Sequence, residues 1–186
     1  MGRPEKLAFH PVCGHPATAY AAGMDEQLAP LPPGTPAPDF TLPRASFVRV
    51  SLADCHGRRV ILVFYPGDWE PVSREQLRLY QDYLPVLARL RADLFGLSTD
   101  HLWSHAAFAR DAGVRFPLLA DCHPSGAVAR AYGVYQEREE RSGRALFVID
   151  ERGIIRWSRA YPLRVNPGVH GILSTLEGLG PADVTP

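Results

Sequence analysis

The residues best placed for nucleophilic chemistry lie just after a strongly apolar run. Residues 64–77 read Phe-Tyr-Pro-Gly-Asp-Trp-Glu-Pro-Val-Ser-Arg-Glu-Gln-Leu, and they join an expected central strand to an expected long helix. The first turn of a helix has unpaired N–H groups and the positive end of the helix dipole, which stabilise an anion and lower the pKa of a thiol there. The side chain of Ser73 therefore occupies a position suited to a reactive nucleophile, at the carboxyl end of a strand where open α/β sheets bind ligands.

The same stretch also has the features of an ordinary helix start. Pro71 suits the first turn, and Ser73 to Gln76 matches the capping-box pattern S-x-x-Q. Taken alone, the segment favours this structural interpretation.

The cysteines offer little other chemistry. Cys13, Cys55 and Cys122 are too few for a disulfide framework and are expected to be reduced. Cys13 lies near His10 and His15, but a fourth metal ligand is missing and the surroundings resemble a loop, so we expect no metal and no cofactor.

Composition indicates one globular domain. The chain has 186 residues, 46% of them apolar and 22% charged, with 20 basic and 20 acidic side chains. No dense basic stretch predicts nucleic-acid binding, and no apolar run is long enough for a membrane span. The sequence starts without the apolar segment of a signal peptide, and we therefore expect a cytoplasmic protein.

The chain divides into three parts. Residues 1–33 form a proline-rich arm that is expected to be flexible, residues 34–180 form the domain, and residues 181–186 form a tail.

Within the domain, apolar spacing predicts alternating strands and helices. Pro85 lies inside the first helix and is expected to kink or divide it. The predicted fold class is α/β, with an N-terminal β-hairpin and a central mixed sheet flanked by helices, as in thioredoxin-like folds. Element order alone also fits flavodoxin-like folds, although no glycine-rich phosphate loop follows a strand. Strands are expected at 39–42, 47–52, 59–65, 93–98, 117–120, 146–150 and 154–158, and helices at 72–92, 101–112, 126–132 and 168–179.

A family resemblance decides between the structural and the chemical interpretation. The segment resembles the peroxiredoxin signature, in which Tyr-Pro is followed by aromatic-Thr-Pro-Val-Cys. Pro66, Trp69, Pro71 and Val72 match it in place. The chain is identified as a member of the peroxiredoxins (AhpC/TSA family, thioredoxin-like superfamily) and looks most like the one-cysteine alkyl hydroperoxide reductase E type. Further matches in the family's order lie at 37–42, 116–121, 131–134 and 144–150.

The resemblance implies roles for individual residues. In the family the peroxidatic cysteine attacks the peroxide O–O bond as a thiolate and becomes a sulfenic acid; Ser73 stands at that position. Arg144 matches the arginine that positions the peroxide, although it could also be a solvated arginine at a strand edge. Glu70 replaces a threonine, and we expect it to pair with Arg144. Pro66 matches the proline that shields the site, and with Trp69 and Val72 it is expected to line the substrate pocket.

The cysteine pattern excludes some subgroups. A resolving cysteine five residues after the peroxidatic one would fall at Arg78, and the C-terminal helix has none. Cys122 remains a candidate resolving thiol. Both cysteine positions of a thioredoxin-type Cys-x-x-Cys are occupied by other residues, which argues against a dithiol oxidoreductase. The implied partners are a peroxide, a thioredoxin-like or low-molecular-weight thiol reductant, and a second copy in a homodimer, with Trp103 or Tyr135 at its interface.

Three functions are compatible with Ser73. The protein could be a thiol peroxidase whose cysteine has been substituted, or a natural pseudo-peroxidase whose fold serves binding or regulation. It could also run other hydrolytic or redox chemistry through Ser73, Glu70 and Arg144. A serine hydroxyl is a weak nucleophile without an activating base, so the chain as written is expected to be inactive as a peroxidase.

Overall fold

The computed structural model describes residues 28–45 and 47–180. Its strands are β1 Thr41–Ala45, β2 Val48–Ser51, β3 Arg59–Phe64, β4 Ala92–Ser98, β5 Leu118–Ala120, β6 Tyr135–Gln136, β7 Arg141–Ser142, β8 Arg144–Ile149 and β9 Ile155–Tyr161. Its helices are α1 Pro71–Arg89, α2 Leu102–Ala112, α3 Ala127–Ala131 and α4 His170–Gly178, and Ala53–Cys55 forms a short 3₁₀ turn.

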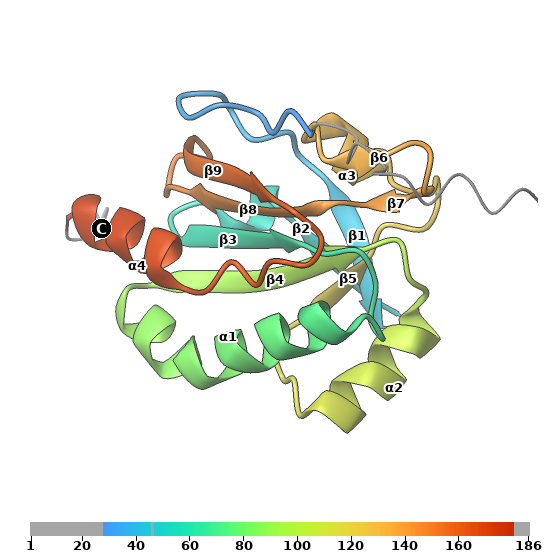
Figure 1. Cartoon of the computed structure of the whole chain (residues 1–186). Helices are drawn as coiled ribbons and strands as arrows, with labels where there is room; N and C mark the ends of the chain where they lie inside the picture. The colour runs from blue at the N-terminus through green and yellow to red at the C-terminus, as the bar shows by residue number, and fades with distance from the viewer. Residues whose placement is uncertain (1–27, 46, 181–186) are drawn as a thin grey trace, which may run out of the picture.

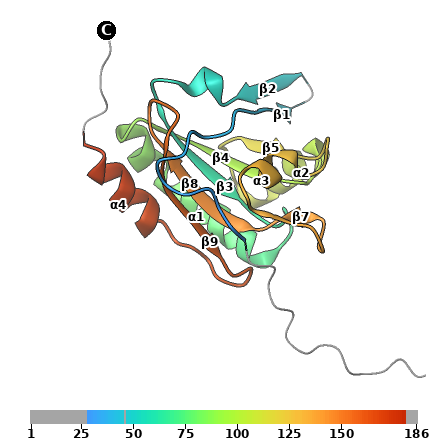
Figure 2. The same ribbon diagram turned by 90° about the horizontal axis from the view of Figure 1, so that it is seen from above.

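The central sheet has the strand order β5-β4-β3-β8-β9. β3 is parallel to β4, and β4 to β5, whereas β3 and β8 are antiparallel, as are β8 and β9. The predicted mixed sheet of an α/β, thioredoxin-like fold is therefore confirmed. The N-terminal hairpin is confirmed as well, as an antiparallel pair of β1 and β2 that lies beside the central sheet (Figure 2).

All six residues of β3 are buried. The apolar run of residues 60–64 predicts this for five of them, and the sixth, Arg59, is buried in an ion pair with Glu151 at 2.7 Å. Alternate side chains enter two different cores. One core is shared with the hairpin and α3, and the other with α1, α2 and α4. Figure 1 shows α1 and α2 on one side of the sheet and α3 on the other. The start of α1 is thereby fixed against the sheet, close to where β3 ends.

Two features differ from the sequence-based expectation. α1 is a single helix with Pro85 inside it, so of the two outcomes predicted for this proline, a kink or a division, the division does not occur. A proline removes one backbone hydrogen bond. However, buried Leu77 and Tyr80 before Pro85, and buried Leu87 after it, still pack the helix onto the sheet. The short pair β6–β7 was not expected, because residues 137–140 between its strands are charged and show no apolar alternation.

The segment before residue 34 is partly packed onto the domain. The backbone N–H groups of Ala29 and Leu31 donate to the carbonyls of Gly133 and Tyr132, at 3.1 and 3.2 Å. Packed structure therefore starts before residue 34. Residues 1–27, with His10, Cys13 and His15, and the tail 181–186 lie outside the described residues. Within the described ranges, no helix combines the length and apolarity needed to cross a bilayer.

Candidate active site

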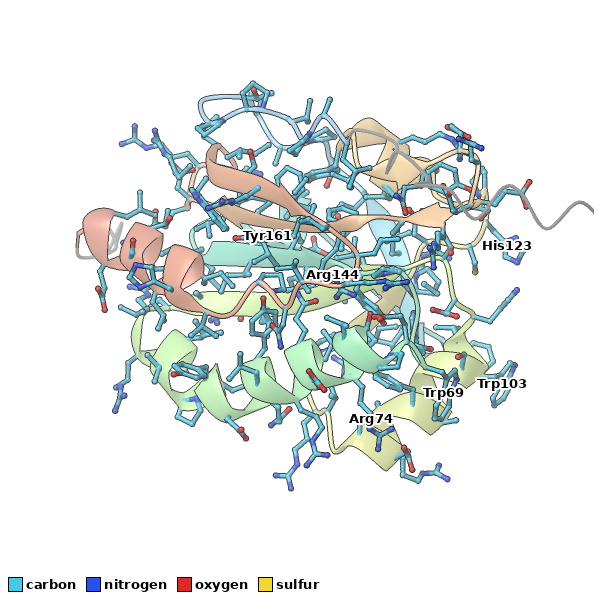
Figure 3. The ribbon with its side chains drawn as sticks, viewed as in Figure 1. Trp69, Arg74, Trp103, His123, Arg144 and Tyr161 are labelled. Carbon is cyan, nitrogen blue, oxygen red and sulfur yellow. The ribbon has the colours of Figure 1, made fainter. Side chains whose placement is uncertain are left out.

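The sheet brings the start of α1 and the start of β8 together. β3 and β8 pair with Phe64 opposite Ala145, so the last residue of β3 lies beside the first residues of β8. The loop that leaves β3 ends at Glu70, where α1 begins, and Arg144 is the first residue of β8. Figure 3 shows Arg144 inside the molecule, between the sheet and α1. Residues 74 positions apart in sequence thus come into contact.

Glu70 caps helix α1. Its Oε1 accepts a hydrogen bond from the N–H of Val72 at 3.1 Å, and its Oε2 accepts one from the N–H of Ser73 at 2.6 Å. The capping-box interpretation, which placed the cap at Ser73, is therefore wrong. The helix starts earlier because Pro71, which has no N–H to satisfy, occupies its first position.

Ser73 lies in the first turn with its side chain fully buried. Its hydroxyl donates to Oε2 of Glu70 at 2.7 Å, and Nη2 of Arg144 lies 3.5 Å from the same hydroxyl oxygen. Among the described residues, these two side chains are the partners of the hydroxyl. The three residues predicted to carry the chemistry are thus brought together.

Arg144 is fully buried, so its interpretation as a solvated arginine is wrong. Its Nη2 donates to Oε2 of Glu70 at 2.7 Å, which confirms the expected pairing. Nη1 donates to Oε1 of Gln76 at 2.5 Å, and Nε and Nη2 donate to the carbonyl of Leu163 at 3.1 and 2.9 Å. A guanidinium so held has a fixed orientation.

Gln76 and Tyr80 belong to this network but were not predicted. Nε2 of Gln76 donates to the Tyr80 hydroxyl at 3.1 Å, and that hydroxyl donates to the carbonyl of Gly168 at 3.0 Å. Ser73, Gln76 and Tyr80 are spaced three and four residues apart, which places them on one face of α1. That spacing is the signal that could have identified them.

The network lowers the pKa of the Glu70 carboxyl below its usual value. Burial acts to raise this pKa, but hydrogen bonds from Ser73, Arg144 and Val72 outweigh it. Burial is also the main reason that the pKa of Arg144 is lowered, and the Glu70 carboxylate opposes that shift. Both groups are charged at neutral pH, and they neutralise each other.

The predicted pocket residues lie around the same loop. Pro66 is buried and Val72 is half-buried. Trp69 is 57% exposed, its Nε1 donates to the hydroxyl of Ser104 at 3.2 Å, and its ring packs edge-on against Phe108 of α2. Their role in lining a substrate pocket stays a prediction.

A histidine near this loop, His105, contacts Asp68. Nδ1 of His105 lies 2.9 Å from Oδ1 of buried Asp68, and the same carboxylate oxygen accepts a hydrogen bond from the Tyr65 hydroxyl at 2.8 Å. His105 therefore stabilises the loop through Asp68. It does not contact Ser73, as a general base would.

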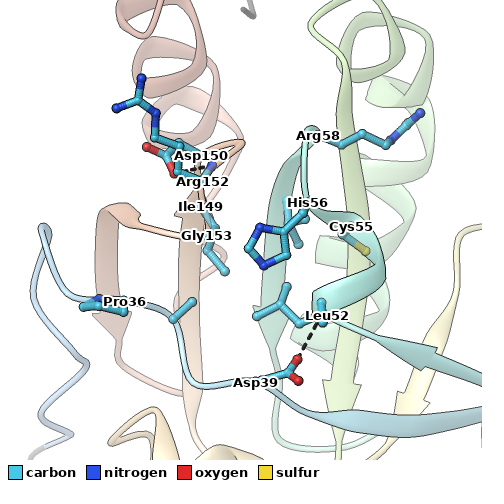
Figure 4. Close-up of a pocket in the computed structure, with 13 residues that line it drawn as sticks. Pro36, Asp39, Leu52, Cys55, His56, Arg58, Ile149, Asp150, Arg152 and Gly153 are labelled. Carbon is cyan, nitrogen blue, oxygen red and sulfur yellow. Dashed lines mark hydrogen bonds between the residues drawn. The ribbon is translucent and has the colours of Figure 1, made fainter. Parts of the chain in front are cut away.

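The two cysteines in the described part of the chain, Cys55 and Cys122, are not hydrogen-bonded to Ser73. Cys55 is buried and donates to the carbonyl of Ser51 at 3.6 Å, and its pKa is raised by burial and then by nearby Asp93. It lines a cavity of about 250 Å³ with His56 and Asp150 (Figure 4). That cavity lies where β3 begins and β8 ends, at the opposite edge of the sheet from Ser73.

Cys122 follows β5 and is half-buried, with its Sγ 3.9 Å from Nδ1 of His101. Burial also raises the pKa of its thiol. Its role as a resolving thiol stays a prediction.

Comparison with known proteins identifies the family. The AhpC/TSA family matches residues 33–158. A peroxiredoxin of Thermoplasma volcanium is 31% identical over 156 residues, covering 81% of this chain and 75% of the relative. Alkyl hydroperoxide reductase E of Mycobacterium tuberculosis is 36% identical over 126 residues, covering 67% of this chain and 82% of the relative.

Solved structures show the same fold. The reduced 2-Cys peroxiredoxin of Plasmodium vivax superposes with a TM-score of 0.74 at 25% identity, covering 81% of this chain and 82% of the other. AhpC of Enterococcus faecalis gives a TM-score of 0.72 at 26% identity, covering 83% and 98%. With the family match extending over the strands and helices that hold Ser73, Glu70 and Arg144, this chain belongs to the AhpC/TSA family of peroxiredoxins.

Proposed function

We propose that this chain is a pseudo-peroxidase: a peroxiredoxin-family protein in which Ser73 stands at the peroxidatic cysteine position and Glu70 closes the peroxide site. The family's activity is thiol-dependent reduction of peroxides. The observation that carries the proposal is the Glu70 carboxylate, which is bound by Val72 N–H, Ser73 N–H, the Ser73 hydroxyl and the Arg144 guanidinium. The fold would then serve binding or regulation.

The hydrogen-bond inventory explains why the site is closed. An ionised carboxylate has about four acceptor positions. On Glu70, four donors occupy these positions: three groups at the start of the helix and the Arg144 guanidinium. These are the donors that a bound peroxide would need. A peroxide could bind only if the carboxylate left, which would break an ion pair with the fully buried Arg144.

Hydrolytic chemistry through Ser73 is less well supported. The 2.7 Å contact with Glu70 has the geometry of a nucleophile and its base. However, the lowered pKa of Glu70 makes it a poor proton acceptor at neutral pH, and the Ser73 hydroxyl is fully buried.

The test is hydrogen peroxide consumption by four purified full-length proteins with excess dithiol reductant: the natural sequence, Ser73→Cys, Glu70→Thr and the double variant Ser73→Cys/Glu70→Thr. We expect no activity from the natural sequence or from Glu70→Thr, slow turnover from Ser73→Cys, and the fastest turnover from the double variant. A carboxylate beside a thiol raises its pKa, and each unit lowers the thiolate fraction about tenfold.

The outcomes separate the alternatives. Peroxide consumption by the natural sequence would refute the pseudo-peroxidase proposal. Equal rates for Ser73→Cys and the double variant would show that Glu70 does not close the site, and would favour a thiol peroxidase whose cysteine alone was replaced.

Other properties follow as parts of the proposal. The one-cysteine type is supported by the match to alkyl hydroperoxide reductase E. A cytoplasmic location is supported by the free thiols of Cys55 and Cys122. A homodimer is supported by exposed Trp103, 80% accessible, whereas buried Tyr135 is a poorer interface candidate. Sedimentation of the natural protein and of Trp103→Ala tests the dimer.

A further inference from the structure

Two histidines and a cysteine meet at the carboxyl edge of the sheet. His101 follows β4 and immediately precedes α2, while Cys122 and His123 follow β5. Because β4 and β5 are parallel neighbours, with Ser98 opposite Ala120, the segments that leave them emerge at the same edge. In Figure 3, His123 projects at the rim of the molecule, away from Arg144. None of the three residues is hydrogen-bonded to Ser73, whose side-chain partners in the described residues are Glu70 and Arg144.

The distances suit a metal ion. Nδ1 of His101 lies 3.9 Å from Sγ of Cys122, and one potential ligand atom from each of the three residues lies within 4.8 Å of the others. In a tetrahedral zinc site, Zn–S and Zn–N bonds of about 2.3 and 2.0 Å place the ligand atoms about 3.5 Å apart. Small side-chain rotations would bring the three atoms to that spacing. Both histidines are exposed, and their rings already contact each other edge to face, with centroids 5.2 Å apart.

The neighbouring carboxylates are engaged by other groups. Asp100 accepts hydrogen bonds from the Ser98 hydroxyl at 2.7 Å and from the Asp68 N–H at 2.9 Å. Asp121 accepts from the N–H groups of Val128 and Ala129 at 3.1 and 2.9 Å. The described residues therefore offer one thiolate and two imidazoles. This is the number of protein ligands in zinc sites that keep an exchangeable position.

We propose that His101, Cys122 and His123 bind one zinc ion, with water or an external ligand in the fourth position. Imidazole and thiolate are the ligand types that zinc prefers. The Cys122 thiol loses its proton to solvent on binding, and its sulfur is then engaged by the metal. The proposal does not depend on Ser73 or on peroxidase activity.

The test uses the full-length, metal-free protein titrated with Co²⁺ and with Zn²⁺. Co²⁺ reports the site through the thiolate-to-cobalt charge-transfer absorption, and calorimetry gives the zinc affinity. We expect one equivalent of each metal. Cys122→Ser should abolish the charge-transfer band. His101→Asn and His123→Asn should each weaken zinc binding about tenfold or more, since losing even an outer partner of a metal ligand costs that much.

Two matched cysteine controls identify the source of the band. Cys55→Ser and Cys13→Ser should leave it unchanged, and circular dichroism confirms that each variant is folded. The absence of a band in the natural protein would overturn the proposal. So would a band that survives Cys122→Ser and is lost in Cys13→Ser, because the ligands would then be Cys13 and the histidines near it in sequence.

Discussion

Oε2 of Glu70 lies 2.7 Å from Nη2 of Arg144, and this ion pair ties the first turn of α1 to the first residue of β8. The two partners differ in burial: the Arg144 side chain is fully buried, whereas the Glu70 side chain is 28% exposed. Removing the carboxylate would leave a buried cation whose remaining partners among the described residues are neutral: Gln76, the Leu163 carbonyl and, at 3.5 Å, the Ser73 hydroxyl. Removing the guanidinium would leave a carboxylate that still has helix N–H donors.

This difference in burial predicts the result of a double-mutant cycle on Glu70 and Arg144. Glu70→Ala should lower the free energy of unfolding by about 3 kcal/mol, because it removes a helix cap and leaves a buried charge unpaired. Arg144→Met should cost less, about 2 kcal/mol, and the double variant should cost less than the sum of the two. Urea denaturation measures all four proteins. Additive effects, or a larger cost for Arg144→Met, would show that the contact does not stabilise the fold as described.

The lowered pKa of Glu70 predicts a pH dependence of stability. A carboxyl whose pKa is lower in the folded protein stabilises the fold above its unfolded pKa of about 4.3, and that contribution is lost as pH falls through the folded pKa. The stability advantage of the natural protein over Glu70→Gln should therefore be greatest at pH 7 and should shrink below about pH 4. Urea denaturation at several pH values measures it.

The control for this pH series is Glu137→Gln. Glu137 also pairs with an arginine, Arg130, at 2.7 Å, but both side chains are largely exposed. Exposed ion pairs contribute little to stability, so this variant should differ little from the natural protein at any pH. A pH-independent difference for Glu70→Gln would contradict the interpretation that the charged carboxylate holds the start of α1 and Arg144 together.

Local pattern was sufficient to predict most of the fold. The run Arg59–Phe64 identified a strand covered on both faces, and the late antiparallel hairpin was expected close to where β8 and β9 lie. The continuity of α1 through Pro85 was not predictable. It depends on how the helix packs against the sheet, and the spacing of residues in the sequence does not reveal that packing.

The site was predictable only in part. The positions of Ser73, Glu70 and Arg144 came from the family resemblance, and their contact follows from the pairing of β3 with β8. The helical spacing of Gln76 and Tyr80 after Ser73 was visible in the sequence, but a glutamine three residues after a serine also fits a capping box, and that interpretation concealed the role of Gln76. Which residue caps the helix depends on where the chain leaves β3, and that is a property of the whole fold.

The hydrogen bond from Tyr80 to the Gly168 carbonyl predicts that the site network also anchors the C-terminal helix. Gly168 lies two residues before α4, and Tyr80 is almost completely buried. Tyr80→Phe removes the donor and leaves a carbonyl unpaired, at a cost of about 1 to 2 kcal/mol. Local opening of α4 should become easier, so its backbone amides should exchange about five- to thirtyfold faster with solvent deuterium.

Helix α2 is the internal reference for that measurement, because no hydrogen bond links it to Tyr80 in the described residues. Gln76→Met is the matched variant: it removes the partner of Arg144 and of Tyr80 but keeps the Tyr80 hydroxyl as a donor to Gly168. Exchange in α4 should therefore rise more in Tyr80→Phe than in Gln76→Met. Equal acceleration of α2 and α4 in Tyr80→Phe would indicate global destabilisation instead. It would mean that the contact with Gly168 does not connect the site to α4.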